Sequence, residues 1–210
     1  MVCRALIPEI NRCCLVTALV VLCGCGGGRP AREAPPSISP SAAGAEALAE
    51  FDTNHDGVIS GAELDKCPAL KSALKRYDTN GDKKVTAANI AARIEKWQST
   101  GTALATLSAA ITLDGQPLVD ASVTAEPEKF LGPEIQSATG KTDAYGNARL
   151  KVSGKPGAHY GLYKIQVSKM EGGKETIPAT YNVNTQLGLE FAPDAPELKS
   201  AGYVFHLKSR

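Results

Sequence analysis

The sequence has few aromatic residues, 5% of the chain, and its formal net charge at pH 7 is only +1. A low aromatic content favours small helical units and small β-sandwiches over a protein with a large cofactor pocket. A net charge so close to zero argues against nucleic acid as a partner. With 210 residues, the chain has room for one or two small domains but not for a large enzyme core.

The chain also lacks any spacing of residues that resembles a zinc motif or a catalytic triad. Its three histidines are His55, His159 and His206, and nothing in the sequence places them together. Isolated histidines of this kind are usually surface or half-buried residues. We therefore predict no catalytic residue and no enzymatic activity.

Cysteine is concentrated at the N-terminus. Two basic residues, Arg4 and Arg12, precede an apolar segment, 13–24, which is too short to span a bilayer but has the length of a signal-peptide core. We assign residues 1–24 to a signal peptide. An ordinary secretory signal cut nearby and an uncleaved anchor are the alternatives.

The signal ends in Leu22-Cys23-Gly24-Cys25, which resembles a bacterial lipobox. The resemblance implies that Cys25 is lipidated and becomes the new N-terminus, and each buried CH2 of the acyl chains contributes about 0.8 kcal/mol to anchoring. Cys23 is a weaker acceptor because the bulky Leu22 would then lie at the cut. Gly26, not Asp, follows the acceptor. By the sorting rule of diderm bacteria, this favours an extracytoplasmic position in the cell envelope, anchored to the outer membrane.

Only Cys67 remains in the predicted mature chain, so no intramolecular disulfide can form. A lone cysteine is more often a small buried hydrophobe than a nucleophile. The segment after the lipobox, GGGRPAREAPPSISPSAAG, has almost no apolar bulk. We therefore assign 25–44 to a disordered, flexible tether.

Residues 45–98 have helical patterns separated by two similar loops. A helix that begins near Glu63 must stop before Pro68, which is well placed to start the next helix. Apolar residues recur at helical spacing through the last segment. Helices are expected at Ala45–Phe51, from Glu63 onward, at Pro68–Tyr77 and at Ala87–Trp97.

The first loop, DTNHDGVISGAE, has the spacing of a 12-residue EF-hand calcium loop, with Gly57 at position 6 and apolar Ile59 at position 8. Calcium prefers about six to eight oxygen ligands. The alternative is a surface turn rich in Asp, Asn and Gly. The predicted ligands are the side chains of Asp52, Asn54, Asp56, Ser60 and Glu63 and the carbonyl of Val58.

The second loop, DTNGDKKVTAAN, is a degraded copy of the first. Position 6 is Lys83 instead of Gly, and a non-glycine residue in the left-handed conformation costs about 1 kcal/mol or more. Position 12 is Asn89, which supplies one oxygen instead of a charged pair. We expect weak calcium binding at best, with Val85 pairing with Ile59 of the first loop. The candidate ligands are Asp78, Asn80, Asp82, Lys84 (through its carbonyl), Thr86 and Asn89.

From residue 103 onward the period changes from helical to alternating, which predicts about six or seven short strands of a small β-sandwich. Glu126, Glu128 and Glu134 make one connecting segment acidic, and a solvated loop is the expected structure there. The inward-facing residues are expected in six rows: 107, 109, 111 and 113; 121, 123 and 125; 148, 150 and 152; 163, 165 and 167; 187, 189 and 191; and 203, 205 and 207.

Four motifs in this region, ITLDGQPLVDASVTAEPE, GKTDAYGNARL, PGAHYGLYKIQVSK and IPATYN, resemble the bacterial carboxypeptidase regulatory-like domain. The resemblance covers Leu104 to about Lys208. It implies a transthyretin-like (prealbumin-like) sandwich and an accessory role without catalytic residues. Ala148 departs from the pattern, since relatives carry a bulkier residue there. The predicted fold is therefore multidomain: a compact all-α EF-hand pair at 45–98, followed by an all-β sandwich at 103–210.

Two functions remain open. The first is a lipid-anchored accessory protein in which Ca2+ stabilises the helical segment that presents the sandwich. The second is a module that binds a protein or a polysaccharide, with purely structural calcium. The second needs an exposed aromatic platform, for which the candidates are Phe130, Tyr145, Tyr160 and Tyr181. The expected partners are the membrane, through the lipid anchor, and an unidentified protein or polysaccharide.

Overall fold

The computed structural model describes residues 34–199 and 202–209. All of these belong to one compact unit, Glu33–Arg210. The predicted signal peptide, Cys25 and the first part of the tether lie outside the described residues. In the described part of the chain, no helix is long and apolar enough to cross a membrane.

The first helix, α1 (Pro40–Phe51), begins earlier than the expected start at Ala45. The side chain of Ser39 accepts a hydrogen bond from the amide of Ala42, and Pro40 occupies the first turn, where its missing N–H is not needed. Residues 40–44, assigned to the tether from their Pro and Ser content, are therefore helical. The helix crosses α3 (Ala87–Gln98) closely: a Cβ added at Gly44 would lie 2.5 Å from the carbonyl oxygen of Ala87.

The segment between α1 and α3 is not purely α-helical. The residues after the first loop form a 3-10 helix, η1 (Gly61–Lys66), which ends where Pro68 starts α2 (Pro68–Tyr77). The two loops contribute short strands, β1 (Ile59–Ser60) and β2 (Lys84–Val85), which form a two-stranded antiparallel sheet. As predicted, Ile59 lies opposite Val85.

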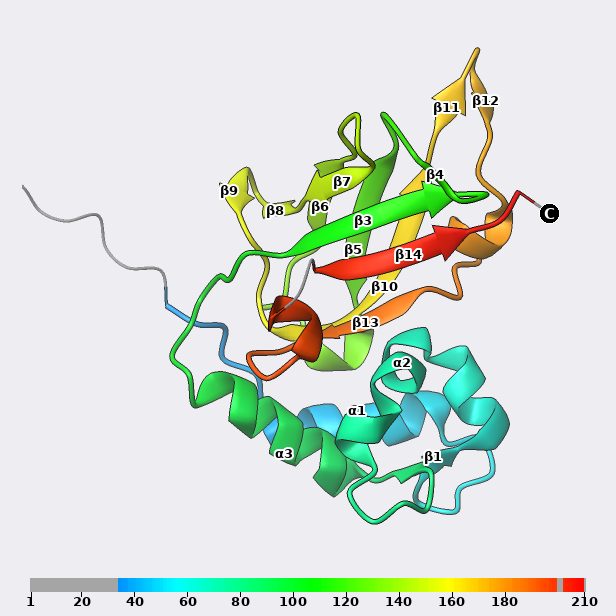
Figure 1. Cartoon of the computed structure of the whole chain (residues 1–210). Coiled ribbons are helices and arrows are strands. Elements are labelled where there is room, and N and C mark those ends of the chain that lie inside the picture. The colour runs from blue at the N-terminus through cyan, green and yellow to red at the C-terminus, as the bar shows by residue number, and fades with distance from the viewer. Residues whose placement is uncertain (1–33, 200–201, 210) are drawn as a thin grey trace, which may run out of the picture. The chain divides into compact units, whose positions relative to one another are not determined.

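Most of the remaining chain forms two larger sheets (Figure 1). The six-stranded sheet has the order β13-β10-β5-β6-β8-β9, and the four-stranded sheet has the order β14-β3-β4, with β7 also paired to β3. The strands of the larger sheet are β5 (Ser122–Pro127), β6 (Ala138–Lys141), β8 (Lys151–Val152), β9 (Lys155–Pro156), β10 (Gly161–Ser168) and β13 (Gly188–Phe191). Those of the smaller sheet are β3 (Ser108–Leu113), β4 (Gln116–Pro117), β7 (Asn147–Arg149) and β14 (Tyr203–Leu207).

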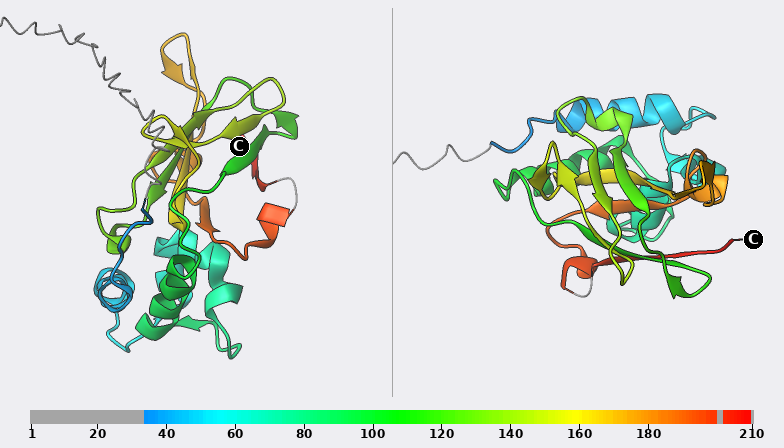
Figure 2. Two further views of the ribbon diagram at one scale, coloured as in Figure 1. Left: turned by 90° about the vertical axis from the view of Figure 1, so that its left-hand side faces the viewer. Right: turned by 90° about the horizontal axis from the view of Figure 1, so that it is seen from above.

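The shorter elements connect or extend these sheets. The β11 (Met170–Glu171) and β12 (Lys174–Glu175) strands form a separate hairpin. Three further 3-10 helices are η2 (Lys129–Leu131), η3 (Ala179–Tyr181) and η4 (Pro196–Lys199). Figure 2, seen from above, shows the smaller sheet lying over one face of the larger one.

The alternating rows predicted from the sequence form the core between the sheets. Sixteen of their positions are buried, whereas Leu113, Leu187 and Phe205 are only half-buried. Ala148, the residue that departs from the family pattern, is fully buried. The alternation of apolar residues did not predict that β14 pairs with β3 in parallel. In this pairing, Phe205 lies opposite Ile111.

The helices cover the outer face of the larger sheet at β10 and β13. The N-terminus of α2 packs directly on β13, since a Cβ added at Gly188 would lie 2.3 Å from the amide nitrogen of Ala69. On the other side of the helical segment, Phe51 makes an edge-to-face contact with Phe130 of η2, with ring centroids 6.2 Å apart. The buried apolar residues of the helices and the sheets form a single cluster.

A buried carboxylate joins the helices to the sheet. Glu190 of β13 is fully buried and forms ion pairs with Arg76 of α2 and with Arg93 of α3, the latter at 2.6 Å. Trp97 donates to its Oε1 at 3.1 Å, and the hydroxyl of Tyr77 lies 3.4 Å from the same oxygen. These contacts orient both helices against β13, because a buried carboxylate must keep its partners.

The predicted fold class, an all-α EF-hand pair followed by an all-β sandwich, is therefore wrong. The structure contains 31% strand and 27% helix, and a compact all-α pair is not seen in the described residues. The helical segment contains the β1–β2 sheet and a 3-10 helix, and its helices share their core and a buried ion-pair cluster with the sheets. The described residues form one mixed α and β unit.

We predict that Glu190→Gln lowers the free energy of unfolding by about 3 kcal/mol, because the buried Arg93 and the half-buried Arg76 both lose the carboxylate that they share. Urea denaturation at pH 7 measures this change. The control is Glu171→Gln, which removes an exposed ion pair with Lys169 and should change stability by less than about 1 kcal/mol. Similar effects of the two substitutions would show that the cluster does not hold the helices on the sheet.

Candidate calcium loops

In the first loop, the side chains of positions 1, 3 and 5 organise the backbone. Asp52 accepts hydrogen bonds from the amides of Gly57 at 2.9 Å and Asp56 at 3.2 Å. Asn54 accepts from the amide of Asp56 at 3.0 Å, and Asp56 accepts from the amide of Val58 at 3.1 Å. Carboxylates that accept main-chain amides in this way fix the path of a short loop.

Glu63, at position 12, closes the first loop. Its Oε1 accepts from the amides of Thr53 at 2.8 Å and Asn54 at 3.3 Å, and its Oε2 accepts from the amide of Ser60 at 3.1 Å. The hydrogen bond from Ser60 is the largest cause that holds the pKa of Glu63 below its ordinary value. Only 6% of Glu63 and 7% of Asp52 is exposed, so the loop buries two carboxylates.

The second loop repeats the pattern at its start. Asp78 accepts from the amides of Gly81 at 2.7 Å and Lys83 at 2.9 Å, and Asp82 accepts from the amide of Lys84 at 2.9 Å. Asn80 accepts from the amide of Asp82 at 3.3 Å. The second loop is more open than the first, because Asp78 is only half-buried.

The two loops differ in where they place glycine. Both have a positive φ at positions 4 and 6: His55 at 59° and Gly57 at 84° in the first, Gly81 at 83° and Lys83 at 59° in the second. Each loop therefore has one glycine and one strained residue, in opposite order. The sequence correctly predicted strain at Lys83, but the same strain at His55 was not anticipated.

The loops also differ at position 12. The side-chain oxygen of Asn89 accepts from the amide of Thr86 at 2.9 Å and from its hydroxyl at 2.8 Å. In return, the hydroxyl of Thr86 accepts from the amide of Asn89 at 3.1 Å, so the pair caps the N-terminus of α3. The one oxygen of the Asn89 side chain is therefore used for capping, whereas Glu63 has two oxygens and a negative charge.

Among residues 34–199 and 202–209, no group of three or more His, Cys, Asp or Glu side chains is arranged to hold a metal ion. The hydrogen bonds of the first loop give a physical reason, since both oxygens of Glu63 accept from main-chain amides. The donor set nevertheless fits a hard cation: Asp52, Asp56 and Glu63 are carboxylates, and two of them are buried in one short loop.

The other candidate residues do not converge on a site. His159 is buried against the carbonyl of Ala103, at 2.7 Å, and His206 is paired with Thr112 on the surface of the smaller sheet. The exposed His55 lies in the first loop. Cys67 is fully buried, as predicted, and burial raises the pKa of its thiol far above the ordinary value.

Sequence reasoning missed two buried carboxylates in the β region. Glu128, expected in a solvated loop, is fully buried, and burial raises the pKa of its carboxyl. It forms an ion pair with Lys164 at 3.3 Å and accepts from the thiol of Cys67 at 3.4 Å. Glu190 follows the buried Leu189 in a row that otherwise alternates, and only the helices packed outside the sheet explain its burial.

The chain matches no protein-family model, no curated protein and no solved structure.

We predict that a glycine at position 6 of the second loop relieves the backbone strain there. Lys83→Gly should raise the free energy of unfolding by up to about 1 kcal/mol, whereas Gly57→Ala should lower it by about 1 kcal/mol or more. A methyl group at Gly57 would meet no atom within 4 Å, so backbone strain alone is tested. Urea denaturation in excess EDTA separates strain from metal binding. If both substitutions change the free energy of unfolding in the same direction, backbone strain at position 6 does not explain the difference between the loops.

Proposed function

We propose that this chain is a lipid-anchored, calcium-binding accessory protein of the bacterial cell envelope. In this proposal, one calcium ion in the loop Asp52–Glu63 stabilises the helical segment and thereby the surface that the packed β-sheets present. The observation that carries the proposal is the burial of two carboxylates, Asp52 and Glu63, in a loop with calcium-binding spacing.

Electrostatics supports a cation in the first loop. Burying a carboxylate is costly unless it is paired, and two in one loop also repel each other. No ion pair joins Asp52 or Glu63 to a basic side chain within the described residues, so only main-chain amides and the hydroxyl of Thr53 stabilise their charge. A divalent cation would offset both charges. The residues that would hold it are Asp52, Asn54, Asp56, Ser60 and Glu63, with the carbonyl of Val58.

The second loop supports the proposal that the two loops differ in their affinity for calcium. Its Asn89 oxygen caps α3, and its two lysines, Lys83 and Lys84, offset the two carboxylates. We therefore assign the second loop a structural role: β2 pairs with β1 and fixes the first loop at Ile59. Asp78, Asn80, Asp82, Lys84, Thr86 and Asn89 form at most a weak calcium site.

Each loop is directly joined to a residue that contacts the sheets, which supports a stabilising role for calcium. Phe51, immediately before Asp52, packs on Phe130. Tyr77, immediately before Asp78, lies beside Glu190. A cation that orders the first loop therefore also restrains the end of α1 where it contacts η2. Calcium is plentiful outside the cytoplasm, so an affinity of about 10⁻⁵ to 10⁻³ M is sufficient.

The lipid anchor and the accessory role rest on the sequence. The lipobox-like Leu22-Cys23-Gly24-Cys25 supports lipidation of Cys25 and an outer-membrane position. The resemblance of Leu104–Lys208 to carboxypeptidase regulatory-like domains supports an accessory role without catalysis.

A binding module with structural calcium is the second candidate, and one observation favours it. Of the four aromatic residues considered for a platform, Phe130 is buried and Tyr160 and Tyr181 are half-buried. Tyr145, by contrast, is 79% exposed. The chain thus presents one aromatic side chain with most of its surface free to contact a ligand.

Calorimetry on the full chain in detergent micelles should detect one calcium ion that binds much more strongly than any second. Glu63→Gln should lower the affinity of this site by about tenfold or more, because it removes a charge from the closing ligand. Asp78→Ala, the matched change in the second loop, should leave it nearly unchanged. EDTA should lower the melting temperature of the parent more than that of Glu63→Gln. Absence of calcium binding by the parent would refute the proposal, and equal losses in both variants would refute the unequal loops.

Cys25→Ser should release the protein from membranes when the full chain is expressed in a diderm bacterium, because Cys23, the alternative acceptor of the acyl chains, is disfavoured by Leu22 at the cut. Fractionation and immunoblotting measure the release. The matched control is Cys23→Ser, which should stay in the membrane fraction. Membrane retention of Cys25→Ser, or release of Cys23→Ser, would show that the anchor was assigned wrongly.

A further inference from the structure

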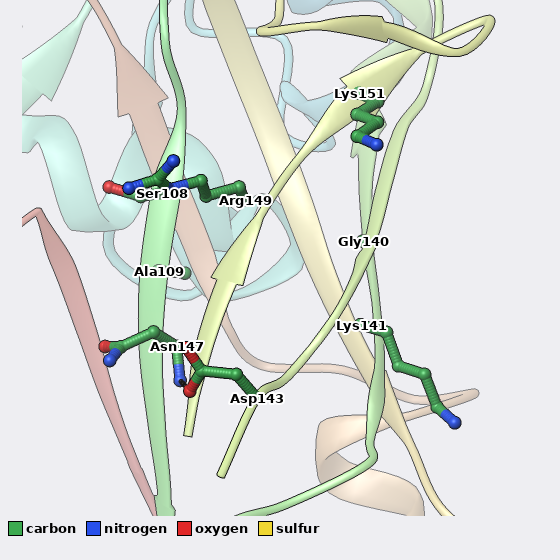
Figure 3. A pocket seen from close by; sticks show the side chains of 8 residues that line it. All are labelled: Ser108, Ala109, Gly140, Lys141, Asp143, Asn147, Arg149 and Lys151. Atoms are coloured by element: carbon green, nitrogen blue, oxygen red, sulfur yellow. Dashed lines mark hydrogen bonds between the residues drawn. The ribbon is translucent and has the colours of Figure 1, made fainter. Parts of the chain in front are cut away.

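A groove lies between β3 and β6, where β7 passes from one sheet toward the other (Figure 3). Its volume is about 700 Å³. Small residues, Ala109 and Gly140, lie in its middle, and the side chains around them are polar or charged. The residues that bear these side chains are Ser108, Lys141, Asp143, Asn147, Arg149 and Lys151.

Strand alternation places the basic residues outside. Ala148, Leu150 and Val152 are buried, so Asn147, Arg149 and Lys151 point outward in one row. Successive members of such a row are roughly 7 Å apart. Figure 3 shows Arg149 extending over β3 beside Ser108, while Lys151 lies over the β6 side of the groove.

The charge of the groove is positive and largely unpaired. Neither Arg149 nor Lys151 forms an ion pair within the described residues, and both are exposed. Lys141 pairs with Asp120 at 2.9 Å, but both side chains are mostly in solvent, which makes this a weak pair. The carboxylate of Asp143 accepts from the amides of Tyr145 and Asn147, so it is used in the turn.

The turn at the end of the groove presents Tyr145 on a fixed backbone. Tyr145 lies between two lining residues, Asp143 and Asn147, and its own amide donates to Asp143 at 2.8 Å. Gly146 has φ of 78°, and a Cβ there would lie 2.5 Å from the carbonyl oxygen of Ile111. The backbone is therefore held against β3, so a ligand that contacts Tyr145 need not order the turn itself.

We propose that this groove binds an acidic polysaccharide, a chain of sugar rings that bear carboxylate groups. Arg149 and Lys151 would pair with the carboxylates, Arg149 through its planar guanidinium. Ser108 and Asn147 offer neutral hydrogen-bonding groups to hydroxyls. Tyr145 offers an aromatic face to the apolar side of a sugar ring. None of these residues belongs to the calcium loops, so the site does not depend on calcium binding.

The shape of the site favours a polysaccharide over an anionic membrane. A bilayer surface is flat on this scale and reaches protruding side chains, whereas the floor of this site is recessed between two strands. The hydroxyl of Ser108 and the amide of Asn147, beside the basic groups, match the many hydroxyls of a sugar chain.

The test is binding of the full chain, in detergent micelles and excess EDTA, to immobilised polygalacturonate. EDTA removes calcium, so this result is independent of the calcium proposal. We expect binding to polygalacturonate, little binding to the neutral polymer dextran, and loss of binding with increasing salt. The double variant Arg149→Gln/Lys151→Gln should weaken binding by about tenfold or more, and Tyr145→Ala should weaken it several-fold.

The control is Lys174→Gln on the β11–β12 hairpin, which removes an exposed positive charge away from the groove and should leave binding unchanged. Unchanged thermal unfolding of the groove variants shows that they are folded. Dextran sulfate and phosphatidylglycerol vesicles test the other anions: equal or tighter binding to either would refute a carboxylate-bearing sugar chain as the ligand. No binding to polygalacturonate, or full binding by the double variant, would overturn the proposal.

Discussion

The ion-pair cluster around Glu190 is the interaction on which the arrangement of the molecule depends. Glu190 has no exposed surface, and its carboxylate meets a guanidinium from each of two helices. Arg93 also forms a pair of hydrogen bonds with Asp194, and its guanidinium lies 5.9 Å from the ring of Tyr77. Arg76 also pairs with Glu197, and Asp194 pairs with Lys96, so the cluster extends from the buried Glu190 to partly exposed charges. A buried cluster of this kind adds little net stability compared with apolar packing, but a docking of the helices that removed both arginines would leave Glu190 buried without a cation.

Because of this docking, the helical segment and the β-sheets, which the sequence predicts as two domains, form one unit. Both candidate calcium loops begin one residue after an aromatic side chain in contact with the β region. The loops are also joined to each other by β1 and β2. A cation bound in the first loop would therefore restrain residues that touch the sheet, whereas in a freely tethered helical module it would not. The groove around Arg149 lies on other strands and has its own chemistry, so the two proposed sites can be tested separately.

The predictions from sequence were correct for features that depend on residues close together in the chain. The alternating rows of the β region depend on the twofold repeat of a strand, and most of their residues are buried as expected. The facing positions Ile59 and Val85 follow from the loop repeat alone. The prediction failed at Pro40, because a Pro- and Ser-rich segment reads as a linker although Ser39 and Pro40 together start a helix. It also failed for Glu128, which was expected in a solvated loop but is buried, and it made no statement about Glu190.

By itself, the sequence determined the spacing of carboxylates in the two loops, the inequality of Gly57 and Lys83, and the faces of the strands. These features follow from the chemistry of residues a few positions apart. Only the tertiary structure decided that the helices and sheets form one unit, that β14 runs parallel to β3, and that Arg149 and Lys151 line one groove with Ser108 and Lys141. Those outcomes depend on contacts between residues far apart in the chain. The buried pairing of Glu190 with Arg76 and Arg93 spans roughly a hundred residues, and no periodicity in the sequence can encode such a contact.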